Sequence, residues 1–200
     1  MDNTDFQPTP EPWDLFDQWY QLAEQHEIND PNAMTLATVG DDGMPSARIM
    51  LLKERDNRGF VFFTNRTSNK GRQLAHPKAA LCWHWKSLRR QIRAEGIIEQ
   101  TTDAESDAYF AMRPRGSQIG AWASLQSQPM ESRIALQTRV ADITKQYEGK
   151  TVPRPPHWGG YRLTPVMVEF WQDREFRLHD RIRYVRPSID ATWTILRLYP

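Results

Sequence analysis

The chain has 200 residues, of which 39% are hydrophobic and 26% are charged, a composition typical of one ordinary globular domain. Its 26 basic and 25 acidic side chains give a formal net charge of +1, so there is no global electrostatic case for a nucleic-acid or membrane partner. No apolar stretch approaches the roughly 18 residues that a membrane span needs, and the single cysteine, Cys82, excludes an internal disulfide and a multi-cysteine metal cluster.

The first residues, 1–11, are acidic and rich in proline, without the basic and apolar regions of a secretion signal. We expect them to form a flexible arm that precedes one domain over residues 12–200. A reducing cytoplasm is the simplest location for a chain with one cysteine.

The elements that follow are predicted from periodicity and turn residues. Residues 12–25 have the apolar spacing of an amphipathic helix. Strands are expected at 33–39, 46–54, 60–65, 79–85, 91–100, 160–172, 177–186 and 192–198. Further helices are expected at 67–76 with Ser68 as N-cap, at 103–112, at 118–124 and at 130–147.

These strands meander through Asp, Asn and Gly turns, with helices inserted between them. The order predicts an α+β protein built on a small antiparallel barrel and argues against a doubly wound sheet. No glycine-rich phosphate loop or nucleophile elbow occurs, and the five histidines lack metal-ligand spacing. Four local clusters of polar residues remain as candidates for chemistry.

The first cluster is Arg48 and Lys53, which lie five residues apart in a predicted strand. Positions i and i+5 of a strand face opposite sides, so one strand can offer a cation to each of two anions. A strand with a polar residue at each end explains the same pattern, and spacing alone favours that simpler interpretation.

The second cluster lies where strand 60–65 leads into the helix of 67–76. Thr64, Ser68 and Lys70 bring a hydroxyl group, a helix start and an ammonium group together, which is typical of an anion pocket. An ordinary N-cap at Ser68 explains these residues equally well.

The third cluster is Tyr109, Arg113 and Ser117. Tyr109 and Arg113 are four residues apart on a predicted helix and so share a face, and Pro114 then turns the chain so that Ser117 can return to it. Two hydroxyl groups around a guanidinium group indicate a phosphate clamp. The alternative is an ordinary surface pair of Tyr and Arg.

The fourth cluster is Arg177, His179 and Arg181, which share one face of a predicted strand. Two arginines that flank one histidine are rarely needed for packing. They suit an anionic or electron-rich ligand, and histidine is the side chain that titrates near neutral pH.

The third and fourth clusters lie in the segments SDAYFAMRPRGSQIGAWAS and RLHDR, and two further specific segments are PRPPHWGGYR and EFWQ. With these segments the chain, from about Asp30 to Pro200, resembles the pyridoxine/pyridoxamine 5′-phosphate oxidase family. The resemblance implies a split-barrel flavin fold with Greek-key-like strand order and a homodimer with two FMN sites at its interface. It also implies oxidation of pyridoxamine 5′-phosphate and pyridoxine 5′-phosphate to pyridoxal 5′-phosphate, with oxygen reduced to hydrogen peroxide.

The resemblance further assigns roles to single residues. Arg48 and Lys70 match residues that hold the FMN phosphate, and Arg177 and His179 match the pair over the substrate ring. The other positions that match flavin contacts are Ile49, Met50, Leu51, Leu52, Lys53, Phe63, Thr64, Asn69, Gln91, Gln126, Ser127, Trp171 and Arg181. The positions that match the grip on the substrate phosphate are Lys53, Tyr109, Arg113 and Ser117.

The sequence departs from the family pattern at three positions, one of them among the residues just named. Asn69 stands where the family usually has Arg, which removes one charge from the expected phosphate site. Asp173 stands where Gly is common after EFWQ, and Phe176 precedes RLHDR in place of a small or polar residue. We expect the last two changes to alter the loop that leads to Arg177.

Three other functions compete with this one. A phenazine-pathway oxidase of the same fold could keep the flavin site and lose the phosphate clamp, but Tyr109, Arg113 and Ser117 are all present. A protein that binds FMN or pyridoxal 5′-phosphate without turnover would use the same residues, so the sequence leaves it open. A nucleic-acid module fails on the neutral net charge.

Overall fold

The computed structural model describes residues 6–200, and they form two compact units. The first unit comprises residues 6–62, 76–98 and 163–200, and the second comprises 63–75 and 99–162. Residues 1–5 of the expected arm lie outside the described part. Just after them, Phe6 packs against Trp19 with ring centroids 5.0 Å apart, and the Thr9 N–H donates to the Tyr184 hydroxyl at 3.0 Å.

The helices and strands follow the sequence-based expectation closely. The helices are α1 (Pro12–His26), α2 (Asn69–Gln73), α3 (Asp103–Met112), α4 (Arg115–Ala123) and α5 (Arg133–Gln146), with a 3₁₀ turn at Glu175–Arg177. The strands are β1 (Ala33–Val39), β2 (Pro45–Leu51), β3 (Glu54–Asp56), β4 (Gly59–Asn65), β5 (Lys78–Trp85), β6 (Arg90–Gln100), β7 (Trp158–Gln172), β8 (Asp180–Val185) and β9 (Thr194–Arg197).

Two of the predicted strands were wrong in extent. The strand expected over 46–54 ends at Leu51, and a separate strand begins at Glu54. The strand expected from Arg177 begins only at Asp180, because Phe176 and Arg177 have φ of 53° and 62°, outside the extended region.

Within residues 6–200 the strands form one nine-stranded sheet in the order β2-β1-β5-β6-β7-β4-β3, with β8 paired to β7 and β9 to β8. The pairings β1–β2, β1–β5, β3–β4, β5–β6, β7–β8 and β8–β9 are antiparallel. The predicted antiparallel α+β architecture is therefore confirmed.

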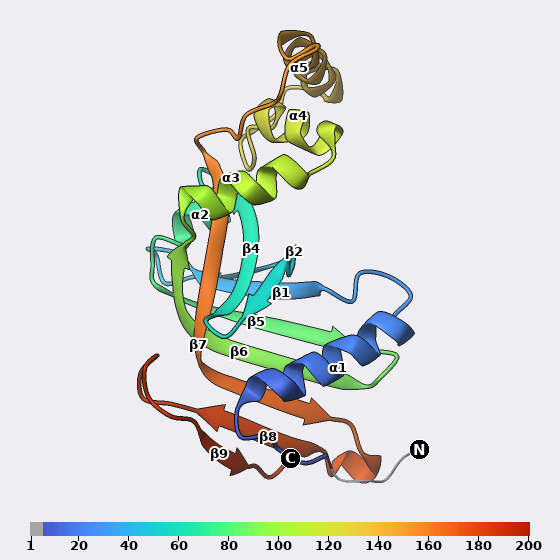
Figure 1. Cartoon of the computed structure of the whole chain (residues 1–200), viewed down its shortest axis with the longest axis vertical. Coiled ribbons are helices and arrows are strands. Elements are labelled where there is room, and N and C mark those ends of the chain that lie inside the picture. Colours follow the sequence, from blue (N-terminus) through green and yellow to red (C-terminus); the bar gives the residue numbers. More distant parts are fainter. Residues whose placement is uncertain (1–5) are drawn as a thin grey trace. The chain divides into compact units, whose positions relative to one another are not determined.

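Helix α1 closes the core of the first unit. Pro12 occupies the start of the helix, where its missing N–H costs nothing, and the apolar spacing turns Phe16 and Trp19 inward. Phe16 packs against Trp83 of β5 and Phe60 of β4 with centroid distances of 5.2 and 4.9 Å, as α1 lies against the strands in Figure 1.

A glycine permits a close backbone approach in the same unit. Gly59 opens β4 with φ of 151°, and a Cβ atom there would lie 2.0 Å from the carbonyl oxygen of Leu163 in β7. Only glycine fits this position, so the turn before β4 is set by packing as well as by its φ angle.

The second unit contains α2, α3, α4 and α5, and residues of α3, α4 and α5 pack in or against a small core of Phe110, Ile119, Val152 and Trp158. Helix α3 begins with a capping box, in which Thr102 and Glu105 each satisfy the other's backbone N–H. This cap fixes the helix that carries Tyr109.

No helix within residues 6–200 has both the length and the apolar content to cross a bilayer. No group of three or more His, Cys, Asp or Glu side chains in this described part could hold a metal ion. A cytoplasmic location stays a prediction.

Candidate functional site

The first set of candidate residues surrounds α2 in the second unit. The Ser68 hydroxyl accepts from the Gly71 N–H at 3.2 Å and donates to the Asn65 carbonyl at 2.7 Å, so Ser68 is the predicted N-cap. A Cβ atom at Gly71 would lie 2.3 Å from the Arg66 carbonyl oxygen, so only glycine lets α2 approach the end of β4. These contacts fix the backbone on both sides of Lys70.

Two residues far along the chain complete this set. The Gln126 side-chain oxygen lies 3.1 Å from the Lys70 ammonium group and accepts from the Thr64 hydroxyl at 3.4 Å. The Asn69 N–H donates to the Ser127 hydroxyl at 3.2 Å. The structure therefore brings together five predicted flavin contacts from two segments that lie more than 50 positions apart in the sequence.

The chemistry of this donor set fits a phosphate group. It offers an ammonium group, two hydroxyl groups and two amide side chains, all of which can donate to phosphate oxygens. Helix α2 has only five residues, shorter than predicted, so the side chains rather than a helix dipole supply the attraction.

A guanidinium group that sequence reasoning missed lies beside Asn69. Arg72 donates to the Asn69 side-chain oxygen and, at 2.5 Å, to the Thr67 carbonyl. The two residues are three positions apart on a helix, and this spacing is the sequence signal that could have paired them.

The second set is an aromatic stack under Arg113, also in the second unit. The rings of Phe63 and Tyr109 are parallel within 7° at a centroid distance of 4.0 Å, and Phe63 lies 5.3 Å from Trp158. The Arg113 guanidinium lies 4.7 Å from the Trp158 ring centroid, within the range of a cation–π contact.

Arg113 has unused donor capacity in this position. Its Nη1 atom is buried and has no hydrogen-bond partner among the described residues. Burial lowers the pKa of Arg113, and nearby Tyr109 acts in the opposite direction. A buried guanidinium nitrogen without an acceptor is costly, so an anionic ligand that reached it would be bound strongly.

Tyr109 and Arg113 lie at the end of α3. The helix ends at Met112, and Arg113 is its C-cap with a helical φ of −68° and a ψ of 145° that redirects the chain only after Arg113. Both side chains lie beside the Trp158 ring. Ser117 lies in the first turn of α4 and is exposed.

The third set lies in the first unit along β2. Arg48 donates to the Thr38 hydroxyl at 2.7 Å, the Ser46 hydroxyl at 2.6 Å and the Leu36 carbonyl at 3.1 Å. Burial lowers the pKa of Arg48. These contacts orient its guanidinium group along one face of β2.

The residues after Arg48 differ in exposure. Ile49 is 65% exposed whereas Leu52 is buried, and Met50 and Leu51 are intermediate. Lys53 is exposed and lies beyond the end of β2, where its N–H donates to the Val61 carbonyl at 2.9 Å. The prediction that Arg48 and Lys53 face opposite sides of one strand was therefore wrong, because the strand stops between them.

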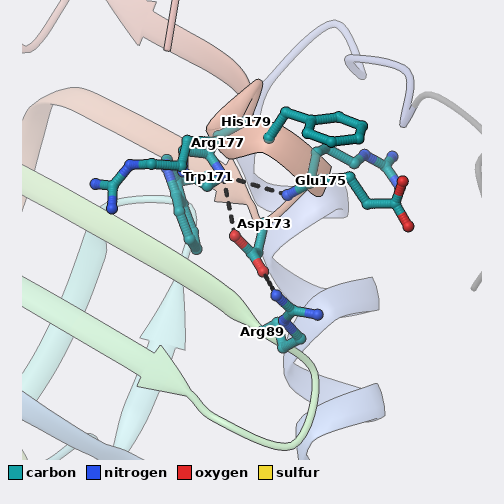
Figure 2. Close-up of a pocket in the computed structure, with 8 residues that line it drawn as sticks. Arg89, Trp171, Asp173, Glu175, Arg177 and His179 are labelled. Carbon is teal, nitrogen blue, oxygen red and sulfur yellow. Dashed lines mark hydrogen bonds and ion pairs between the residues drawn. The ribbon is translucent and has the colours of Figure 1, made fainter.

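The fourth set lines a pocket of about 440 Å³ at the loop between β7 and β8. Figure 2 shows this loop, in which Trp171 and His179 lie close together with ring centroids 4.6 Å apart. The lining residues are Arg89, Trp171, Asp173, Arg174, Glu175, Phe176, Arg177 and His179. Three predicted site residues, Trp171, Arg177 and His179, therefore belong to one pocket.

Arg181 lies just beyond this pocket on β8 and is bound to a buried carboxylate. Glu169 is 2% exposed and accepts from Arg181 at 2.9 Å, Arg183 at 2.6 Å and Arg93 at 3.3 Å. Burial raises the pKa of Glu169, but the hydrogen bonds from Arg183 and Arg181 outweigh it and the net shift is downward. Gln91, the remaining candidate, pairs with His84 between β6 and β5.

Backbone strain marks the same places. Non-glycine residues rarely adopt a positive φ, and such strain clusters at functional sites. The described residues other than glycine with positive φ are Asp30, Arg89, Ser127, Phe176 and Arg177. Four of these five belong to the α2 set or line the pocket at the β7–β8 loop.

Comparison with known proteins assigns this arrangement to a class. Residues 22–147 match the family model described as pyridoxamine 5′-phosphate oxidase, and residues 158–200 match that of a pyridoxine 5′-phosphate oxidase C-terminal dimerisation region. A structure described as a pyridoxamine 5′-phosphate oxidase-related, FMN-binding protein from Nostoc punctiforme has a TM-score of 0.73 at 19% identity, covering 95% of this chain and 98% of that one. The fold is thus the split barrel of FMN-binding proteins.

Closer relatives define the family. A protein of Azorhizobium caulinodans named pyridoxine/pyridoxamine 5′-phosphate oxidase is 60% identical over 98% of this chain and 93% of its own length. One of Brucella canis with the same name is 55% identical over 98% and 97%. The structure of PhzG from Burkholderia lata, in complex with tetrahydrophenazine-1-carboxylic acid, has a TM-score of 0.91 at 32% identity and covers 99% and 98%. The chain belongs to the pyridoxine/pyridoxamine 5′-phosphate oxidase family.

Proposed function

We propose that the protein oxidises pyridoxamine 5′-phosphate and pyridoxine 5′-phosphate to pyridoxal 5′-phosphate, with FMN as cofactor and oxygen reduced to hydrogen peroxide. The observation that carries the proposal is the 60% identity, over 98% of the chain, with a relative named for this oxidation. The buried Arg113 nitrogen, which has no acceptor among the described residues, supports a phosphorylated substrate.

The α2 set and Arg48 are the residues that would hold the flavin phosphate. Lys70 and Arg48 supply the two cations, and Thr64, Asn69 and Ser127 supply neutral donors. Other flavin contacts are assigned to residues 49–53, Phe63, Gln91, Gln126, Trp171 and Arg181. When bound, the flavin accepts a hydride from the substrate carbon that carries the amine or alcohol.

The chain itself supplies binding and orientation. Arg113, with Tyr109, Ser117 and Lys53, binds the substrate phosphate, which is remote from the reacting carbon. Binding energy gained there can hold the ring in a reactive orientation, which removes much of the entropic barrier. Arg177 stabilises negative charge that develops over the ring, and His179 beside it handles a proton.

We further propose that two copies of the chain form the working unit. The match of residues 158–200 to a dimerisation region supports this. On the family pattern, some of the flavin contacts assigned to Gln91, Gln126, Ser127, Trp171 and Arg181 come from the partner subunit.

The test uses the purified protein with its bound cofactor. We expect an absorbance spectrum with flavin bands that bleach when pyridoxamine 5′-phosphate is added without oxygen. Admission of oxygen should restore the bands and yield pyridoxal 5′-phosphate and hydrogen peroxide in equal amounts. A flavin that stays oxidised with both substrates would overturn the proposal and indicate binding without turnover.

A phenazine-type oxidation is the alternative favoured by one observation, the TM-score of 0.91 to PhzG. That relative shares 32% of its sequence with this chain, against 55–60% for the relatives named as pyridoxine/pyridoxamine 5′-phosphate oxidases. A reduced phenazine carboxylate in the same anaerobic assay separates the two, because only the favoured substrate should bleach the flavin at micromolar concentration.

A further inference from the structure

Asp173 and His179 face each other across the base of the β7–β8 loop. The strands pair Trp171 with Arg181 and Gln172 with Asp180, so the next pair outward in the same register is Asp173 and His179. Residues opposite each other in antiparallel strands have their Cβ atoms about 5 Å apart. The Asp173 Oδ1 atom lies 3.0 Å from His179 Nδ1, and the two side chains are 13% and 14% exposed.

The Asp173 carboxylate is fixed from its other side by the turn between β5 and β6. Its Oδ2 atom pairs with the Arg89 guanidinium, and its backbone N–H donates to the Arg89 carbonyl at 3.0 Å. Figure 2 shows Asp173 between Arg89 and His179. The carboxylate therefore has one oxygen for Arg89 and one for the imidazole ring.

The same ring nitrogen has a second neighbour. The Arg174 backbone N–H lies 3.2 Å from His179 Nδ1 and can donate to it only when Nδ1 carries no proton. When Nδ1 carries a proton, it donates to Asp173 instead. The Arg174 hydrogen bond requires a bare Nδ1, whereas the 3.0 Å approach of the carboxylate favours a protonated one. A hydrogen bond to a carboxylate is about twice as strong as a neutral one, so we expect the contact with Asp173 to outweigh the bond from Arg174.

The charged groups around the ring support this assignment. The Arg174 guanidinium is turned to Asp180, with Nε 2.6 Å from Oδ2, and Arg89 is paired with Asp173. Asp173 is therefore the carboxylate in contact with the imidazole ring. Trp171 covers the ring from one side at 4.6 Å.

We propose that Asp173 is a positioning residue that holds neutral His179 in the Nδ1–H tautomer, which leaves Nε2 as a proton acceptor in the pocket. This inference rests on the proposed function for its chemical role. There, an amine or hydroxyl group of the substrate gives its proton to Nε2, and the charge of the resulting imidazolium is balanced by Asp173.

The tautomer can be measured without turnover. We would label the histidines of the FMN-loaded protein with ¹⁵N and record the shifts of both ring nitrogens at a pH where the ring is neutral. His179→Gln identifies the signals, because the chain has only five histidines. We expect protonated Nδ1 and bare Nε2 in the parent protein, and the reverse in Asp173→Ala, where the Arg174 N–H becomes the partner.

Glu175→Gln is the matched control. It removes one negative charge from the lining of the same pocket, but Glu175 is exposed and is not paired with His179. We expect His179 to have the same tautomer in Glu175→Gln as in the parent protein. A bare Nδ1 in the parent protein, or an unchanged tautomer in Asp173→Ala, would overturn the proposal.

Steady-state kinetics test the chemical role separately. General acid–base groups contribute about 10²–10⁴-fold to rate, and loss of positioning should remove part of this, so we expect kcat in Asp173→Ala to fall at least about tenfold while KM changes little. Asp173→Asn keeps an oxygen acceptor for Nδ1–H and should recover part of the rate. A change in KM with kcat unchanged in Asp173→Ala would overturn the positioning role of Asp173. Equal kcat values in Asp173→Ala and Asp173→Asn would overturn it as well. If the parent protein does not turn over at all, the proposed function fails, and the NMR result still decides the tautomer.

Discussion

Arg113 is the residue whose contacts most directly predict substrate preference. Its guanidinium rests on Trp158 and keeps one buried nitrogen without an acceptor in the described part of the chain. A hydrogen bond to a charged group contributes about 1.5–3 kcal/mol, or roughly ten- to a hundredfold in affinity. We expect Arg113→Ala to raise KM for pyridoxamine 5′-phosphate by this factor and to affect unphosphorylated pyridoxamine much less.

Arg115→Ala is the matched control for this prediction. Arg115 lies two positions further on, and its guanidinium donates to the Lys150 and Tyr147 carbonyls at 3.0 and 2.6 Å, so its loss should lower stability without changing the preference. Steady-state kinetics with pyridoxamine 5′-phosphate and with pyridoxamine give the KM values whose ratio measures this preference. Equal losses with and without the phosphate would contradict the assignment of Arg113 to the clamp.

A second prediction for a single residue concerns Asn69 and the affinity for FMN. Asn69→Arg adds a charge-assisted donor near the proposed flavin phosphate, but Arg72 lies three positions away and now bonds the Asn69 side chain. Like charges at this spacing cost about 0.2–0.5 kcal/mol, so we expect FMN to bind tighter by only about 0.5–1 kcal/mol, less than a full charge-assisted bond.

Fluorescence titration of the apoprotein with FMN at two salt concentrations measures this change. Asn69→Gln, longer but neutral, serves as control and should not tighten binding. Weaker binding in Asn69→Arg, or an affinity that ignores salt, would mean that position 69 does not face the phosphate.

At the scale of elements, the capping box of α3 ties stability to pH. The Thr102 backbone N–H and hydroxyl donate to Glu105 and, with the bond from Arg162, outweigh burial to lower the pKa of Glu105 to about 2 from a usual 4.5. Because the folded pKa is depressed, the stabilisation is fully present above the unfolded pKa. It is lost as pH falls through the folded value.

We therefore expect Glu105→Gln to lower the free energy of unfolding by about 1–2 kcal/mol at pH 7. The deficit should shrink by about 1 kcal/mol at pH 3.5, since each unit of pKa difference is worth about 1.4 kcal/mol. Urea denaturation at both pH values measures this deficit.

Thr102→Ala is the control. It removes the hydroxyl that caps the Glu105 N–H, so part of its deficit should remain at both pH values. A Glu105→Gln deficit that is the same at pH 3.5 as at pH 7 would contradict the assignment.

Helices whose signals lie in neighbouring residues could be predicted from the sequence. Contacts that depend on how two strands pair could not. The periodicity around Phe16 and the cap at Ser68 lie within one turn of the residues they control, so α1 and α2 were found. The strand expected from Arg177 failed, because Phe176 and Arg177 adopt positive φ without the glycine that usually signals it. The Asp173–His179 pair required the β7–β8 register, and Gln126 reaches Lys70 only through the fold of the second unit.

At the scale of the whole molecule, the C-terminal region offers a surface for a second copy. Residues 158–200 match a dimerisation region, and within them Ile195, Leu196 and Tyr199 are 38%, 40% and 94% exposed in the single chain. Apolar side chains exposed along an edge strand are a liability unless a partner covers them. We infer that β9 contributes to the subunit interface.

This inference couples FMN affinity to protein concentration. A ligand that binds only the assembled state stabilises that state by RT ln(1 + [L]/Kd), about 2.7 kcal/mol at a hundredfold excess over Kd. Leu196→Asp places a charge at an exposed apolar position of β9 and should shift the protein towards monomers. We expect its FMN affinity to fall at nanomolar protein and to recover at tens of micromolar, where mass action restores the dimer. Sedimentation velocity with and without FMN measures the monomer and the dimer.

The control is Ile134→Asp, at a 72% exposed site on α5 outside the matched C-terminal region. A variant that sediments as a monomer yet keeps full FMN affinity would separate cofactor binding from assembly and refute the coupling.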